Sequence, residues 1–153
     1  MEKEIEKKFL VKEIPNNIEQ YECIHMEQCY ISISPVIRLR KENEKFLLNI
    51  KGNGLMIRKE FEIEITEEEY NKLILKRETP FINKVRYKIP IKNNFVAELD
   101  IYNNKLYGLI TVEVEFRSEK ELLNFISPDW FGKDITFDKR YKNVYLSLNG
   151  IPK

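Results

Sequence analysis

The sequence has few of the residues from which many enzymes build their active sites. Its 153 residues include one histidine, His25, and two cysteines, Cys23 and Cys29. A metal site with several histidines is therefore excluded, and a Ser-His-Asp triad would have a single candidate base. The cysteines form no CxxC pair, so they are expected to be reduced, structural thiols of a cytoplasmic protein.

Glycines and long apolar runs are scarce as well. The five glycines form neither a P-loop nor a dinucleotide-binding fingerprint, so any phosphate group must be held by side chains. No uncharged run is longer than ten residues, which argues against a membrane-spanning helix, and the charged N-terminus is unlike a signal peptide. The 26 Lys and Arg nearly balance the 25 Asp and Glu, so a generic nucleic-acid binder is not expected.

Hydrophobic and charged residues alternate along most of the chain, whose length suits one domain covering residues 1–153. Alternation with period two is typical of a β-strand with two unlike faces. It predicts about eight strands, near residues 4–11, 25–33, 37–40, 46–51, 56–65, 84–89, 95–101 and 110–116.

Helical patterns interrupt these strands after Pro15, at 66–75, at 118–126 and at 137–148. The second and third open with a capping box, formed by Thr66 with Glu69 and by Ser118 with Glu121. The aromatic pair at 130–131 is expected to anchor a loop against the end of the sheet. Many strands, few helices and short connections favour an α+β fold that is mainly antiparallel β.

The charged faces of the predicted strands carry charges of one sign two residues apart. The pairs are Glu4/Glu6, Arg38/Arg40, Glu60/Glu62, Lys84/Arg86, Glu98/Asp100 and Glu113/Glu115. A sheet face that simply lies in water usually mixes signs, because neighbouring like charges repel. Carboxylate pairs suit hard divalent cations, and Arg and Lys pairs suit phosphate oxygens.

An eight-stranded antiparallel sheet can close into a barrel whose alternate residues point inward. With the charged faces inside, the barrel would enclose a tunnel lined by both signs of charge, and helices or a second subunit would cover the apolar outer faces. Because buried unpaired charge is costly, such a tunnel favours a bound polyanion that carries its own metal ions. The competing interpretation is a sheet with one face in water.

An ordered series of motifs resembles the CYTH superfamily, also called the triphosphate tunnel metalloenzymes. The motifs are Glu4-Ile5-Glu6-Lys7-Lys8, Gln28 with Tyr30, Val36-Ile37-Arg38-Leu39-Arg40, Leu48-Asn49-Ile50-Lys51-Gly52, Arg58-Lys59-Glu60-Phe61-Glu62, Lys84-Val85-Arg86-Tyr87, Glu98-Leu99-Asp100, and Gly108-Leu109 before Glu113-Val114-Glu115. The resemblance covers essentially the whole chain, with one departure at Ala97, where a Trp is often found. It implies an eight-stranded closed barrel with flanking helices and metal-dependent chemistry on triphosphates.

The resemblance also implies roles for the charged rows. The expected ligands of one or two Mg²⁺ or Mn²⁺ ions are Glu4, Glu6, Glu60, Glu62, Glu98, Asp100, Glu113 and Glu115. Glu98 and Asp100 could instead orient neighbouring basic side chains. The expected phosphate-binding residues are Lys8, Arg38, Arg40, Lys51, Arg58, Lys84, Arg86 and Arg140. If Lys8 and Lys84 face each other, repulsion would lower a pKa and let one act as a catalytic base, and otherwise both only bind phosphate.

Small bacterial relatives of this type hydrolyse inorganic triphosphate to pyrophosphate and phosphate, and that is the expected activity. The alternatives are an adenylyl cyclase, a thiamine or nucleoside triphosphatase, and a non-enzymatic binder of polyphosphate. The expected partner is a small-molecule triphosphate, without nucleic acid or membrane, and a homodimer would account for apolar outer faces that the helices leave uncovered.

Overall fold

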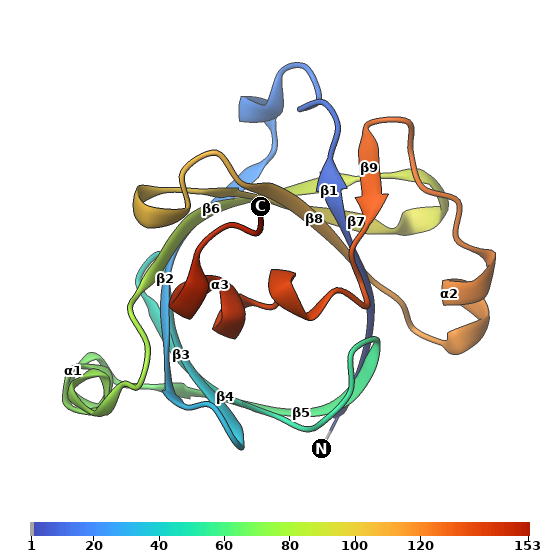
Figure 1. The fold of residues 1–153 in the computed structure, drawn as a ribbon. Helices are drawn as coiled ribbons and strands as arrows, with labels where there is room; N and C mark the ends of the chain where they lie inside the picture. The colour runs from blue at the N-terminus through green and yellow to red at the C-terminus, as the bar shows by residue number, and fades with distance from the viewer. Residues whose placement is uncertain (1) are drawn as a thin grey trace.

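The computed structural model of the protein describes residues 2–153. Within them the chain forms nine antiparallel strands: β1 (Glu2–Val11), β2 (Glu22–Ser32), β3 (Val36–Glu42), β4 (Lys45–Lys51), β5 (Ile57–Ile65), β6 (Ile82–Pro90), β7 (Val96–Tyr102), β8 (Ile110–Glu115) and β9 (Phe131–Asp134). The strand order is β5-β4-β3-β2-β6-β7-β8-β1, and β5 pairs with β1 to close the ring (Figure 1). The expected closed eight-stranded barrel is therefore confirmed.

The ninth strand corrects the sequence prediction, which placed the aromatic pair at 130–131 in a loop. The first residues of β1 pair with β5, but this pairing ends at Ile5, opposite Ile57. The same edge of β1 is then open, and β9 pairs there with Phe9 and Val11. Phe131 is buried, with its ring centroid 5.0 Å from that of Phe9. Burial of these rings and the free edge of β1 together explain why the segment becomes a strand.

The apolar faces of the strands point outward and are covered in part by helices. Helix α1 (Glu67–Leu73) places Tyr70 against Phe46, while α2 (Glu119–Asn124) buries Leu122 over the cluster that contains Phe9. Both predicted capping residues, Thr66 and Ser118, accept the expected hydrogen bond from a backbone N–H.

The remaining helical elements are short. They are the 3₁₀ turns η1 (Ile18–Gln20), η2 (Ile74–Lys76), η3 (Lys92–Asn94), η4 (Asn104–Leu106) and η5 (Lys139–Tyr141), and helix α3 (Asn143–Asn149). The helix expected after Pro15 is thus a single turn, and the pattern at 137–148 is divided into η5 and α3. The helix α3 ends before Gly150, as predicted, at a backbone φ of 81° that glycine tolerates. No helix among residues 2–153 combines the length and apolar character needed to cross a bilayer.

The C-terminal segment lies across one opening of the barrel (Figure 1). Leu146 of α3 has no exposed surface and packs in a cluster with Ile82 and Tyr102, which fixes the segment to the barrel. On the outer face of β5, Phe61 and Ile63 are more than 40% exposed. The homodimer expected from such faces stays a prediction.

Candidate active site in the barrel

The barrel encloses a cavity of about 240 Å³ that is lined mainly by charged side chains. All predicted site residues except Lys84, Asp100 and Arg140 line it: Glu4, Glu6, Lys8, Arg38, Arg40, Lys51, Arg58, Glu60, Glu62, Arg86, Glu98, Glu113 and Glu115. The cavity is therefore a tunnel of mixed charge, as the alternation of the strands predicted.

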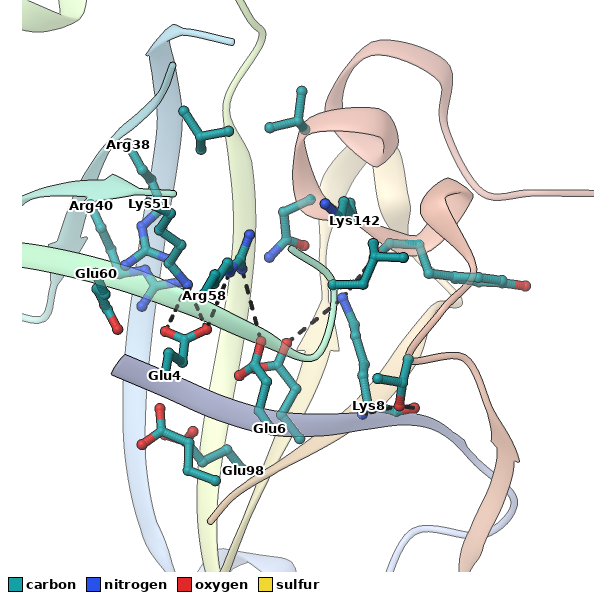
Figure 2. A pocket seen from close by; sticks show the side chains of 18 of the residues that line it. Glu4, Glu6, Lys8, Arg38, Arg40, Lys51, Arg58, Glu60, Glu98 and Lys142 are labelled. Atoms are coloured by element: carbon teal, nitrogen blue, oxygen red, sulfur yellow. Dashed lines mark hydrogen bonds and ion pairs between the residues drawn. The ribbon is translucent and has the colours of Figure 1, made fainter. Parts of the chain in front are cut away.

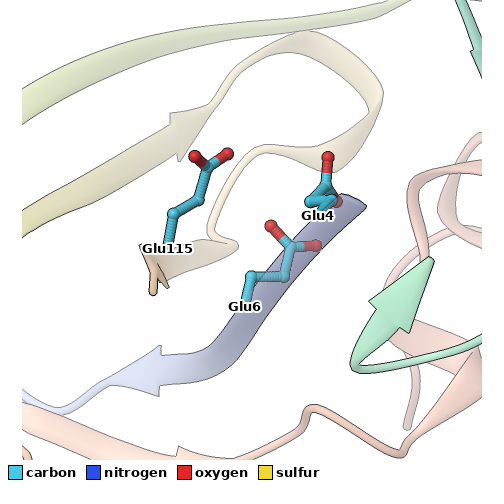
Figure 3. A group of neighbouring side chains, drawn as sticks. All are labelled: Glu4, Glu6 and Glu115. Carbon is cyan, nitrogen blue, oxygen red and sulfur yellow. The ribbon is translucent and has the colours of Figure 1, made fainter. Parts of the chain in front are cut away.

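Three carboxylates meet on one side of this tunnel. Glu4 and Glu6 follow each other on the inner face of β1, and Glu115 lies opposite Glu6 on β8. One oxygen atom from each of the three lies within 4.8 Å of the others (Figure 3). Burial raises the pKa of Glu6, and the negative charges of Glu113 and Glu4 raise that pKa further. The group is thus a concentration of negative charge that a cation would relieve.

The chemistry of these donors fits a hard divalent cation. All three residues offer carboxylate oxygens, which are the ligands that Mg²⁺ and Mn²⁺ prefer. Burial raises the pKa of Glu115, as do nearby carboxylates. Burial also opposes ionisation of Glu4, but a hydrogen bond with Glu60 and the charges of Lys51 and Arg58 outweigh it, so the pKa of Glu4 is well below its usual range.

Cationic side chains from the neighbouring strands β5 and β4 lie directly beside the carboxylate cluster. The Nζ atom of Lys51 lies 3.1 Å from an Oε atom of Glu4, and the Nε atom of Arg58 lies 3.5 Å from the other. Arg58 also reaches Glu6, at 3.9 Å (Figure 2). Glu4 therefore lies where the cationic groups of the tunnel meet the anionic groups.

Several buried atoms of the barrel interior have no hydrogen-bond partner within the described residues. They include the donors Arg38 Nε and Gln28 Nε2 and the acceptor Asn49 Oδ1, while Arg58 Nε has only the ion-pair contact with Glu4 at 3.5 Å. Burial and the nearby charge of Arg40 lower the pKa of Arg38 to about 10. Buried polar atoms are nearly always paired, so the unpaired arginine donor favours contact with an anionic ligand.

Asp100 was predicted either to bind metal or to orient neighbouring basic side chains, and its contacts favour the second role. It has no exposed surface and accepts hydrogen bonds from Lys84 Nζ at 2.7 Å and from Arg86 Nε and Nη2 at 2.7 and 2.9 Å. These bonds leave Arg86 free to reach Glu98 at 3.2 Å and Glu113 at 3.9 Å inside the tunnel. Asp100 thus positions Arg86, which forms ion pairs with the tunnel carboxylates Glu98 and Glu113.

Lys84 was predicted to bind phosphate, and it is not among the residues that line the tunnel. Its side chain is fully buried against Asp100 and the ring of Tyr102, so a role at phosphate stays a prediction. Burial, rather than repulsion by Lys8, is the main cause that lowers the pKa of Lys84 to about 7. Lys8 itself donates from Nζ to the carbonyl oxygen of Tyr141 at 2.7 Å and lies 3.7 Å from Glu113.

Arg140 is the third residue outside the lining. Its guanidinium group is about half exposed and binds Asp138 at 2.7 Å, because Asp138 caps the turn η5 and holds the neighbouring arginine. Lys142, two residues later, lines the tunnel instead and donates to the carbonyl oxygen of Gly54 at 3.5 Å (Figure 2). The C-terminal segment supplies a cation as expected, but from a different residue.

Two neutral amides were not recognised as functional residues from the sequence. Asn49 is fully buried and donates to Glu60 and, at 3.3 Å, to Glu62. Gln28, also fully buried, accepts from Arg40 Nε at 2.9 Å. Both lie on inward-facing positions, so the alternation that located the charged residues could also have located these amides.

Comparison with known proteins gives two relatives over nearly the whole chain. The inorganic triphosphatase of Nitrosomonas europaea is 36% identical over 149 residues, which cover 95% of this chain and 97% of the relative. The inorganic triphosphatase of Acetivibrio thermocellus is 34% identical over 152 residues, which cover 97% and 96%. No protein-family model matches the chain.

Solved structures agree with these relatives. The crystal structure of an inorganic triphosphatase matches with a TM-score of 0.72 at 34% identity, covering all of this chain and 99% of the other. A structure from Hippeastrum, reported to have a dominant triphosphatase activity, has a TM-score of 0.56 at 15% identity over 80% of this chain and 83% of its own, and shows a shared fold alone. The two relatives and the matching barrel structure show that this chain belongs to the inorganic triphosphatases of the CYTH superfamily, also called the triphosphate tunnel metalloenzymes.

Proposed function

We propose that this protein hydrolyses inorganic triphosphate to pyrophosphate and phosphate inside its tunnel, with one or two Mg²⁺ or Mn²⁺ ions. The observation that carries the proposal is that one cavity holds both kinds of group. The cluster of Glu4, Glu6 and Glu115 lies on β1 and β8, and cationic groups from β3, β4 and β5 lie beside it, together with Glu60 and Glu62. A triphosphate accompanied by divalent cations supplies partners for both kinds of group.

The carboxylate cluster is the proposed metal site. Glu4, Glu6 and Glu115 would hold a first ion, and the nearby tunnel carboxylates Glu60, Glu62, Glu98 and Glu113 would complete its surroundings or hold a second. A divalent cation bound there would offset phosphate charge and make water a better nucleophile. Oxygen ligands serve both Mg²⁺ and Mn²⁺.

The cationic groups form the proposed phosphate site. Arg38, Arg40, Lys51 and Arg58 present donors from three adjacent strands, and Arg86 adds another beside the carboxylates. Phosphoanhydride hydrolysis needs mainly neutralised charge and an in-line arrangement of the reacting atoms, with little covalent help from the protein. Fixed guanidinium groups supply both, because their forks match phosphate oxygens.

Lys8 would bind phosphate at the end of the tunnel nearest the C-terminal segment. Its Nζ atom donates to the carbonyl oxygen of Tyr141 at 2.7 Å and lies 3.7 Å from Glu113, and the residue lines the tunnel. Of the two lysines considered for proton transfer, Lys8 is therefore the one placed to contact a phosphate in the tunnel.

Phosphate release from inorganic triphosphate by the purified protein, with Mg²⁺ or Mn²⁺, tests the proposal. We expect one orthophosphate and one pyrophosphate per turnover, and no turnover after chelation of the metal. Glu6→Gln should lower the rate by about 100-fold or more, since even residues that only orient metal ligands commonly account for 10–100-fold. Glu67→Gln, in the exposed first turn of α1, is the matched control and should leave the rate unchanged.

A substrate panel separates the other activities considered for this sequence. Cyclic AMP formed from ATP would indicate an adenylyl cyclase, and preferential cleavage of thiamine or nucleoside triphosphates would identify another triphosphatase. Tight binding of tripolyphosphate without turnover at any metal concentration would contradict hydrolysis and indicate a binding protein.

A further inference from the structure

The loop between β4 and β5 contains an asparagine followed by a glycine. The chain has two such steps, Asn53-Gly54 in this loop and Asn149-Gly150 at the end of α3. Asparagine is a chemically labile residue, and a following glycine makes it more so, because a successor without a side chain lets its backbone nitrogen approach the asparagine amide. The two steps therefore share the same intrinsic reactivity and differ only in how the fold restrains them.

The fold does not restrain the reaction at Asn53. Residues 52–54 are exposed and belong to no helix or strand. Within the described residues 2–153, neither the Asn53 side chain nor the Gly54 N–H forms a hydrogen bond. Gly54 has a backbone φ of 129°, and a Cβ atom there would collide with the carbonyl oxygen of Ile57. The loop thus requires the very residue that makes Asn53 reactive.

The second step is held by the helix. The Gly150 N–H donates to the carbonyl oxygen of Leu146 at 2.9 Å, so the nitrogen that would attack is already engaged. The side chain of Asn149 donates from Nδ2 to the carbonyl oxygen of Tyr145 at 3.2 Å. Reaction at Asn149 requires the last turn of α3 to open first. The chain therefore contains a free Asn-Gly step and a protected one.

The loop that contains Asn53 makes contacts with the tunnel residues. The carbonyl oxygen of Gly54 accepts a hydrogen bond from Lys142 Nζ at 3.5 Å, and that of Met56 accepts from the Glu6 N–H at 3.0 Å. Leu55, which lies between these two carbonyl groups, lines the tunnel, as does Lys142. A change in the backbone of this loop therefore reaches a cation and a carboxylate of the proposed site.

We propose that Asn53 is a deamidation site whose modification weakens substrate binding in the tunnel. The Gly54 nitrogen gives its proton to solvent and forms a bond to Cγ of Asn53, while the side-chain nitrogen leaves as ammonia. The product is a five-membered succinimide ring. Water adds to one of its two carbonyl carbons and the C–N bond at that carbon breaks, which gives aspartate or isoaspartate. The net reaction consumes one water and releases one ammonia, and it needs no oxidant or cofactor.

Both products alter the contact with Lys142. Isoaspartate adds a methylene group to the main chain directly before Gly54, which displaces the carbonyl oxygen that binds the lysine. Each product also adds a negative charge one residue from that carbonyl group, and the charge attracts the lysine away from a phosphate. Burial and the positive charges of Arg58, Lys139 and Lys51 lower the pKa of Lys142, so its surroundings are cationic. This inference rests on the proposed function, because it takes the tunnel as the substrate site.

Mass spectrometry of the purified protein during incubation in warm, mildly alkaline buffer tests the site. Trypsin releases Asn53 in the peptide 52–58 and Asn149 in the peptide 143–153, so the mass gain from amide to carboxylate is read separately for each. We expect the peptide 52–58 to convert, with isoaspartate among its products, while 143–153 keeps its amide. An unmodified peptide 52–58, or equal conversion of both peptides, would overturn the assignment.

Substitutions of Asn53 test the effect on binding. In converted wild-type protein we expect KM for inorganic triphosphate to rise by about fivefold, the scale of one weakened hydrogen bond. Asn53→Gln keeps the amide but would have to close a larger ring, so it should begin at the wild-type KM and hold it through the incubation. Asn53→Asp adds the charge without the methylene group and should raise KM less. Asn149→Gln is the matched control and should change with time as the wild type does.

The two readouts separate this inference from the proposed function. An unchanged KM in fully converted protein would overturn the effect on binding. A protein that binds tripolyphosphate without hydrolysing it would refute the hydrolysis, whereas the mass spectra do not depend on turnover. In that case the calorimetric Kd for tripolyphosphate, before and after conversion, tests the modification, and an equal Kd would count against it.

Discussion

Asp100→Asn tests the buried ion network behind the tunnel wall. In the native protein one carboxylate with no exposed surface serves two buried cations, Lys84 and Arg86. Asparagine has nearly the same shape and keeps one acceptor oxygen, but it carries no charge and adds a donor beside the cations. The substitution therefore removes the charge with little change in packing volume.

The cost follows from the burial of the partners. Removing one member of a buried ion pair typically costs about 3–5 kcal/mol, because the remaining charge is left uncompensated. Here Lys84, whose pKa burial already lowers to about 7, can lose its proton in the variant. We therefore expect the free energy of unfolding to fall by about 3 kcal/mol, the lower end of this range. For a domain of this size, that corresponds to a fall in Tm of about 6–12 °C.

Urea unfolding followed by circular dichroism gives the free energy directly, and a thermal scan gives Tm. Glu121→Gln is the control, because Glu121 forms an equally close ion pair with Arg117, at 2.8 Å, on the surface. Exposed pairs contribute little to stability, so this variant should unfold almost like the wild type. If Asp100→Asn were as stable as the wild type but needed more metal for activity, Asp100 would be a metal ligand after all.

The stability difference between Asp100→Asn and the wild type should depend on pH in a defined direction. Loss of the negative charge lowers the pKa of Lys84 further below about 7 in the folded variant. A lysine with a lowered folded-state pKa takes up a proton on unfolding, so stability falls with decreasing pH until that pKa is reached. Below about pH 7, protonation of Lys84 no longer lowers the stability of the wild type. The stability of the variant continues to fall there, because its Lys84 has a lower pKa in the folded state. The difference should widen from about pH 8 to about pH 6, and a constant or shrinking difference would contradict the assignment.

Two further predictions concern the C-terminal helix and the buried amide. Leu146→Ala should reduce the free energy of unfolding by about 2–5 kcal/mol, because the side chain is fully buried, whereas Leu148→Ala, at a 45% exposed position, should cost much less in the same urea titration. Asn49→Ala should raise the metal concentration for half-maximal activity by about tenfold, since it frees Glu60, and an unchanged requirement would exclude Asn49 from the site.

Much of the fold could be predicted from local patterns. The alternation of apolar and charged residues located the eight barrel strands, and the capping boxes at Thr66 and Ser118 located two helices, because both signals lie within one element. The strand β9 could not be found this way. Its four residues show no alternation, and it pairs with the part of β1 that lies beyond the pairing with β5.

The site was predicted in outline and corrected in detail. Glu4, Glu6 and Glu115 meet as a metal-binding cluster should, but their assignment as ligands stays a prediction. Lys84 and Asp100 carry the expected charges yet bind each other, because a short ion pair at full burial leaves neither in contact with the tunnel. Membership in the triphosphatase family is confirmed by relatives that match nearly the whole chain.

By itself, the sequence determined which side chains share a face of each strand, and hence that acidic and basic rows would line one interior. That follows from the period of a β-strand, which is a property of neighbouring residues. Only the tertiary structure decided which charges pair with each other and which stay available to a ligand. Closure of the barrel sets the distances across strands, and burial sets the cost of leaving a charge alone, so Asp100 became a structural counterion while Glu6 was left beside other carboxylates.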